Sequence, residues 1–179
     1  MGAKYVMKDK SIVLIGFMGV GKTTVGKELA NKLGWEFVDT DEEIEKQFGM
    51  TTMKIFATYG EETFRKKEKE TIIQFSSQWK KVISVGGGAF LQEDIRKACM
   101  ENTNVVHLAM SYEAWQNRLP DIIDSRPVLH GKDMDEIKEL FDERNTIYGY
   151  HHFQLIVDQL TPQEAATAII NQLALHPVD

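Results

Sequence analysis

The chain has 179 residues, 42% of them apolar, and its 21 basic and 27 acidic residues give a formal net charge of −6. This length suits one domain spanning residues 1–179, and a lone cysteine, Cys99, excludes a disulfide framework or a cysteine-rich zinc site. No apolar run approaches the ~18 residues of a membrane span, and residues 1–10 do not resemble a secretory signal. We therefore expect a soluble cytoplasmic protein with no membrane partner. Because the chain is net acidic, we also expect no nucleic-acid partner.

Short apolar runs alternate with helical periodicity along the chain. We predict strands over residues 11–15, 36–38, 82–85, 105–109 and 155–157. We predict helices over residues 22–33, 61–75 and 133–148, a short helix closed by Gly49, and a last helix opened by a capping box at residues 161–164. Such alternation indicates βαβ units and therefore an α/β fold with a parallel sheet, in which ligands bind beyond the carboxyl ends of the strands.

A phosphate-binding loop follows the first predicted strand. Residues 16–23 (GFMGVGKT) match G-x-x-x-x-G-K-[ST], the P-loop. Glycines let backbone N–H groups curl around an anion, and the helix that follows adds its positive N-terminal end. Lys22 can then reach the β- and γ-phosphates, and the Thr23 hydroxyl can ligate Mg²⁺.

Two carboxylates end the second predicted strand. Asp39 and Asp41 are two residues apart, so in extended chain both face the same side, beside the P-loop. This arrangement favours Asp39 for Mg²⁺ and Asp41 for an acceptor alcohol whose proton it could take. Alternatively, Asp41 caps a helix that begins at Glu42. The local sequence leaves both interpretations open.

Further candidates lie on later segments. Gly86, Gly87 and Gly88 would let backbone approach a substrate, or they only form a tight strand-to-helix crossover. Arg65 and Glu68 are three residues apart on the helix over residues 61–75, which is typical of a surface ion pair.

Two more arginines have open interpretations. Arg126 lies in a loop-like segment, residues 120–132, that could be a lid closing on the γ-phosphate, or the arginine is simply solvated. Arg144 shares a helix face with Phe141 and Tyr148, which indicates an anionic partner unless its side chain extends to solvent.

Together these segments resemble the shikimate kinases. The matching segments run from the first strand to about Val157: GFMGVGKTT, FVDTD, IFATYGEETFRKKE, SVGGGA, SRPVL and ERNTIY. The resemblance implies a three-layer α/β/α P-loop kinase fold with a central five-stranded parallel sheet, a lid at about residues 118–132 and a substrate-binding region at about residues 41–70. It also implies transfer of the γ-phosphate of ATP to the 3-hydroxyl of shikimate, with Mg²⁺ as cofactor, on the pathway to chorismate and the aromatic amino acids.

The resemblance also assigns roles to individual residues. The nucleotide-binding residues would be Gly19, Val20, Gly21, Lys22, Thr23, Thr24, Arg118 and Arg126. The substrate-binding residues would be Asp41, Phe56, Phe64, Arg65, Glu68, Gly86, Gly87, Gly88 and Arg144, with the two arginines gripping the carboxylate of shikimate. Lys22, Asp41 and Arg126 would be catalytic, and Thr23 and Asp39 would serve the metal.

Four of the five arginines therefore fall on motif positions, and only Arg96 is left without a role. Two rival functions share the P-loop: a kinase for another hydroxy acid such as gluconate, and a nucleotide-binding module that regulates a partner. The first would not predict Arg65 and Arg144 together with the three glycines, and a silent module would be expected to lose Lys22 or the two aspartates. We expect a monomer whose partners are shikimate and ATP.

Overall fold

A five-stranded parallel sheet forms the centre of the computed structural model, which describes residues 9–175. The expectation about a secretory signal therefore falls largely outside the described residues. The strands are β1 (Ile12–Ile15), β2 (Glu36–Asp39), β3 (Lys81–Ser84), β4 (Asn104–Ala109) and β5 (Phe153–Ile156), in the order β2-β3-β1-β4-β5.

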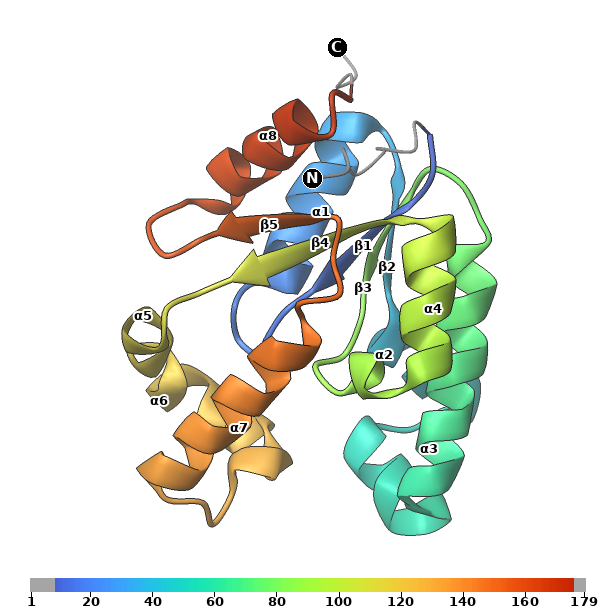
Figure 1. Cartoon of the computed structure of the whole chain (residues 1–179). Helices are drawn as coiled ribbons and strands as arrows, with labels where there is room; N and C mark the ends of the chain where they lie inside the picture. Colours follow the sequence, from blue (N-terminus) through green and yellow to red (C-terminus); the bar gives the residue numbers. More distant parts are fainter. Residues whose placement is uncertain (1–8, 176–179) are drawn as a thin grey trace.

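Helices cover both faces of this sheet (Figure 1). They are α1 (Lys22–Leu33), α2 (Thr40–Phe48), α3 (Thr52–Ser76), α4 (Glu93–Asn102), α5 (Tyr112–Gln116), α6 (Leu119–Ile122), α7 (Met134–Ile147) and α8 (Pro162–Gln172). Helices α1 and α8 pack together on one face, and α3 packs beside α4 on the other. This confirms the predicted three-layer α/β/α fold with a five-stranded parallel sheet. Within the described chain, no helix combines the length and apolarity that crossing a membrane requires.

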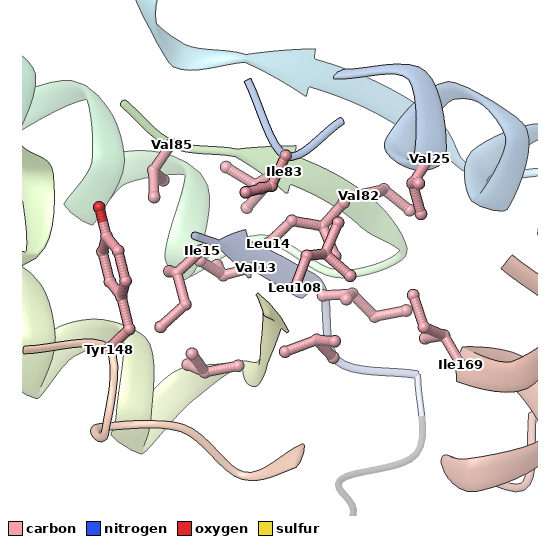
Figure 2. Close-up of a cluster of buried hydrophobic side chains, with 14 of the residues drawn as sticks. Val13, Leu14, Ile15, Val25, Val82, Ile83, Val85, Leu108, Tyr148 and Ile169 are labelled. Carbon is pink, nitrogen blue, oxygen red and sulfur yellow. The ribbon is translucent and has the colours of Figure 1, made fainter. Parts of the chain in front are cut away.

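The core lies around the central strands. All four residues of β1 are at most 1% exposed, and every residue of β4 is buried. Strands covered on both faces need continuous apolar runs, and each buried aliphatic side chain contributes roughly 1.5–3 kcal/mol. Figure 2 shows Leu14, Val82 and Leu108 meeting in this core, with Tyr148 at one border and Ile169 of α8 at another.

The register of β1 determines where the site is built. β1 pairs with β3 on one side, Leu14 opposite Ser84, and with β4 on the other, Ile15 opposite His107. The connection that follows β1 leads to β2 on one side of it, whereas the connection that follows β3 leads to β4 on the other side. The carboxyl end of β1 therefore lies where the order of the strands reverses. Ligands of open α/β sheets bind at such a point.

Two predictions about elements were wrong. Helix α3 begins at Thr52, nine residues earlier than predicted, because Thr51 caps it and accepts a hydrogen bond from the backbone N–H of Lys54. Gly60 interrupts α3 with φ 84° and ψ 164°. Because of this kink, the apolar spacing of the first two turns does not continue the spacing of residues 61–75, so the sequence pattern does not reveal these turns. The segment predicted as a loop over residues 120–132 instead holds most of α6 and two 3₁₀ turns, Ile123–Ser125 and Pro127–Leu129.

Candidate active site

The P-loop joins β1 to α1 and takes the form that the motif predicts. Gly19 and Gly21 have φ of 80° and 100°, values that L side chains rarely adopt, so glycine suits both positions. Lys22 opens α1, and its Nζ donates hydrogen bonds to the carbonyl oxygens of Gly16 at 2.6 Å and Phe17 at 3.1 Å. The ammonium group is therefore folded back onto its own loop.

Charge around Lys22 affects its protonation. Burial, followed by the positive charge of Arg126, lowers the pKa of Lys22 from 10.5 to about 8, although Asp41 and Asp39 act in the opposite direction. Arg126 is an exposed residue between the two 3₁₀ turns, yet its charge influences both Lys22 and Asp41. The basic and acidic groups predicted for catalysis thus lie close enough to affect one another.

Thr23 and Asp39 come together as predicted. The Thr23 hydroxyl lies 3.3 Å from Asp39 Oδ2, to which it donates. Asp39 Oδ1 accepts the backbone N–H groups of Asp41 and Glu42 and so caps α2. A hydroxyl and a carboxylate oxygen are ligands that Mg²⁺ accepts, with phosphates completing the shell, and no cluster of three His, Cys, Asp or Glu side chains suited to a metal occurs among residues 9–175.

Asp41 does not cap the helix, so that alternative is wrong: the cap is Asp39, and α2 begins at Thr40. Asp41 Oδ1 is shielded from solvent, and no group in the described chain hydrogen-bonds to it. Burial, then the negative charges of Glu68 and Asp39, raise the pKa of Asp41 to about 6. A buried carboxylate oxygen without a donor is costly, so this oxygen is poised to receive one from a ligand.

Gly86, Gly87 and Gly88 border the predicted substrate groups. A Cβ on Gly86 would lie 3.1 Å from Asp41 Oδ1, and one on Gly88 would lie 2.8 Å from Arg65 Nη2 and 3.0 Å from Arg144 Nη1. The Gly87 carbonyl accepts a hydrogen bond from Arg144 Nη1 at 2.8 Å. The glycines therefore do more than form a crossover, because side chains there would displace a carboxylate and two guanidinium groups.

The two arginines reach this point from different helices. Arg144 does not extend to solvent; α7 directs its guanidinium to the glycine segment. The Arg65–Glu68 pair is not a surface pair either, because the Glu68 side chain is 1% exposed and its Oε1 lies 2.8 Å from Arg65 Nη1. Both guanidinium groups thus lie next to Gly88, close to the same point, as an anion-binding site would require.

Phe56 and Phe64 lie on α3 with their ring centroids 4.8 Å apart. Phe64 is buried with Ile44 and Ile55 in a small cluster of its own, against which Phe56 packs. This cluster joins α2 to α3 and so connects the helix that carries Asp41 to the helix that carries Arg65. The predicted substrate-binding role of both rings stays a prediction.

The other end of the P-loop opens into a pocket. Val20, Gly21 and Thr24 line it together with Arg118, whose Nη1 donates to the Gly19 carbonyl at 3.0 Å. Val157, Leu160 and Pro162, which follow β5, complete the lining. The resemblance assigns no role to residues 159–162, yet the apolar side chains that follow β5 lie beside a guanidinium here and suit the planar base of a nucleotide.

Sequence reasoning missed several residues that support the site. Trp115 Nε1 donates to the Met18 carbonyl at 2.8 Å, and the Tyr148 hydroxyl donates to the Gly87 carbonyl at 2.7 Å. Gln92 donates to Glu68 Oε1 at 3.0 Å. The available signal was that buried Trp and Tyr groups need polar partners, but the sequence does not indicate which partners.

Comparisons with known proteins agree with this geometry. The family model "Shikimate kinase" matches residues 18–174. The shikimate kinase of Oceanobacillus iheyensis is 47% identical over 96% of this chain and 94% of its own length, and that of Bacillus subtilis is 47% identical over 94% and 91%. The structure of the Acinetobacter baumannii shikimate kinase in complex with shikimate superposes with a TM-score of 0.86, at 31% identity, over 97% of both chains.

These matches cover the whole site, from the P-loop to the helix that carries Arg144 and the pocket after β5. The identity to the relatives is well above the level at which a shared fold alone would be concluded, and it extends over nearly the full length of each. The chain belongs to the shikimate kinase family.

Proposed function

We propose that this protein transfers the γ-phosphate of ATP to the 3-hydroxyl of shikimate, giving ADP and 3-phosphoshikimate. The observation that best supports this proposal is that the guanidinium groups of Arg65 and Arg144 lie together at Gly88, two residues from Gly86, which borders the carboxylate oxygen of Asp41 that has no donor in the described chain. A ligand with a carboxylate at one end and hydroxyls at the other matches this charge arrangement, because guanidinium groups bind carboxylates and a carboxylate accepts hydrogen bonds from hydroxyls.

The chemistry follows from this placement. The substrate hydroxyl oxygen forms a bond to the γ-phosphorus while the bond from that phosphorus to the β–γ bridging oxygen breaks, and the hydroxyl proton passes to Asp41. Lys22 and Arg126 neutralise charge on the transferring group, and catalysis is mostly positioning and electrostatics. Thr23 and Asp39 would hold Mg²⁺, which when bound neutralises phosphate charge.

Nucleotide binding is assigned to Gly19, Val20, Gly21, Lys22, Thr23 and Thr24, with Arg118 beside the base. We place the adenine in the pocket that Arg118 shares with Val157, Leu160 and Pro162. A guanidinium stacks well on a flat aromatic ring, and apolar side chains cover its other face. The segment around residues 118–132, including Arg126, would act as the lid.

An assay of ADP release tests this proposal. Shikimate, gluconate and quinate are each offered with ATP and Mg²⁺, and we expect turnover with shikimate well above that with the others. A matched Lys22→Met variant controls for contaminating kinases, because it keeps the side-chain volume but loses the charge. ADP release without any acceptor, or equal rates with gluconate, would support the rival functions instead.

A further inference from the structure

Gln92 stands at the N-cap of α4 but does not cap it. Its side chain makes no hydrogen bond to the first turn of α4, and glutamine is not among the shorter polar residues, Ser, Thr, Asp and Asn, that usually cap a helix. Instead, Nε2 of Gln92 lies 3.0 Å from Glu68 Oε1 and 3.3 Å from the Arg65 carbonyl oxygen, and donates to both. The amide therefore turns away from α4 and binds two points on α3.

Those two points lie at either end of the Arg65 side chain, whose guanidinium is bound by Glu68 at Nη1 and, at the longer distance of 3.4 Å, by exposed Glu61 at Nε. Glu68 Oε1 accepts from both Arg65 Nη1 and Gln92 Nε2, while the Glu68 side chain is 1% exposed. A buried carboxylate needs such donors. Arg65 Nη1, held in this way, and Arg65 Nη2 both lie beside Gly88, 3.0 and 2.8 Å from where a Cβ would stand.

Among residues 9–175, Gln92 is the one neutral side chain that donates a hydrogen bond to Glu68. Burial raises the pKa of Glu68, whereas Arg65, then Gln92, then Arg144 act against that rise. The negative charge of Asp41 lies across Gly86 from Glu68. Without Gln92, the Glu68 carboxylate would keep Arg65 as its only direct donor in the described chain, and Arg65 would be held by Glu68 and by a longer contact from its Nε to Glu61 Oε1, 3.4 Å.

We propose that Gln92 is a positioning residue for recognition of the substrate carboxylate. It acts through Glu68 and the Arg65 backbone to hold the Arg65 guanidinium in place beside Gly88. This inference rests on the proposed function, in which Arg65 binds the carboxylate of shikimate.

The alternative is that Gln92 has a structural role alone and stabilises the packing of α4 against α3. The chain offers a matched control for that role: Lys69, next to Glu68 on α3, forms an ion pair with Asp94 of α4 at 3.1 Å. A Lys69→Met variant removes a tie between the same two helices without touching Glu68 or Arg65.

The main variant is Gln92→Ser. Serine is a good N-cap and so keeps or improves α4, but it is too short to reach Glu68. We expect KM for shikimate to rise about tenfold, the size of one hydrogen bond to a charged group, with kcat and KM for ATP within about twofold and the melting temperature kept. The inhibition constant of shikimate methyl ester, which carries no charge at that end, should change less than about twofold.

Gln92→Met, in which the new side chain is close to glutamine in volume, is the second variant. We expect the same rise in KM for shikimate and the same small change for the methyl ester, even if the serine variant folds poorly. Equal losses for shikimate and its methyl ester, or a loss in Lys69→Met as large as in Gln92→Ser, would overturn the inference. An Arg65→Met variant distinguishes a failure of the Gln92 inference from a failure of the proposed function. If it raises KM for shikimate and the Gln92 variants do not, only this inference fails; if it has no effect either, the proposed substrate site is wrong.

Discussion

A methyl group at Gly88 should weaken shikimate binding while leaving the fold intact. Gly88 has φ −93° and ψ −8°, which alanine adopts without strain. The added Cβ would stand 2.8 Å from Arg65 Nη2 and 3.0 Å from Arg144 Nη1, whereas ordinary contact begins at 3.4 Å. The guanidinium groups must therefore retreat by about half an ångström, and as ends of flexible side chains they can do so at little cost to folding.

The expected loss follows from what those nitrogens would bind. Charge-assisted hydrogen bonds contribute about 1.5–3 kcal/mol each, so loss of one such bond in Gly88→Ala should raise KM for shikimate roughly 10- to 100-fold. The assay is coupled ADP release over a range of shikimate concentrations, with thermal melting as the check on folding. KM for ATP should stay within about twofold.

A double-mutant cycle with Arg65→Lys sharpens this prediction. Lysine lacks the planar fork that Gly88→Ala displaces, so the two losses should overlap and the double variant should lose less than their product. Strictly multiplicative effects, or a Gly88→Ala variant with unchanged KM, would refute the idea that Gly88 makes room for the guanidinium groups.

The remaining predictions concern catalysis and pH. Arg126→Ala should lower kcat by roughly 10³-fold or more if the arginine stabilises the transferring phosphoryl group, with shikimate binding by calorimetry retained; a change within a few-fold would exclude that role. Asp41→Asn should lower kcat roughly 10²–10⁴-fold if Asp41 accepts the hydroxyl proton, and an unaltered rate in the same assay would leave it at most a positioning role. Burial lowers the pKa of His107 from 6.5 to about 4, so between these values the unfolded chain binds a proton that the folded chain does not, and the free energy of unfolding decreases as the pH is lowered. His107→Phe should reduce the loss of unfolding free energy between pH 7.5 and pH 5 by about 2 kcal/mol in urea titrations, whereas an unchanged pH dependence would contradict this.

The parts of the site that the sequence predicts well are those encoded within a few residues. The P-loop follows from glycine spacing after an apolar strand, and the meeting of Thr23 with Asp39 follows from parallel strands ending at one edge. Supporting contacts could not be predicted in this way. The partners of Trp115 and Tyr148 lie 97 and 61 residues away in the sequence, so only the packed fold brings them together.

Arg96, the arginine without a predicted role, illustrates the same limit. Its Nη1 donates to the carbonyl oxygens of Phe90 and Leu91, and its guanidinium lies 5.0 Å from the ring centroid of Tyr150. It therefore secures the turn just after the glycine segment against the end of α7. None of the three partners carries a sequence signal, because two are backbone oxygens and the third, Tyr150, lies more than fifty residues further along the chain.

The resting hydrogen bonds of the P-loop have a consequence for anion selectivity. Lys22 is bound to the carbonyl oxygens of Gly16 and Phe17, and Arg118 to that of Gly19. An anion that binds Lys22 or Arg118 must therefore replace these hydrogen bonds, because neither side chain is without a partner in the described chain. Because that exchange costs Lys22 two hydrogen bonds, we expect chloride to bind the loop less well than a polyphosphate, whose several oxygens can accept from Lys22 and from the backbone N–H groups of the loop together. The loop would then discriminate between anions by the number of hydrogen bonds that they accept as well as by charge.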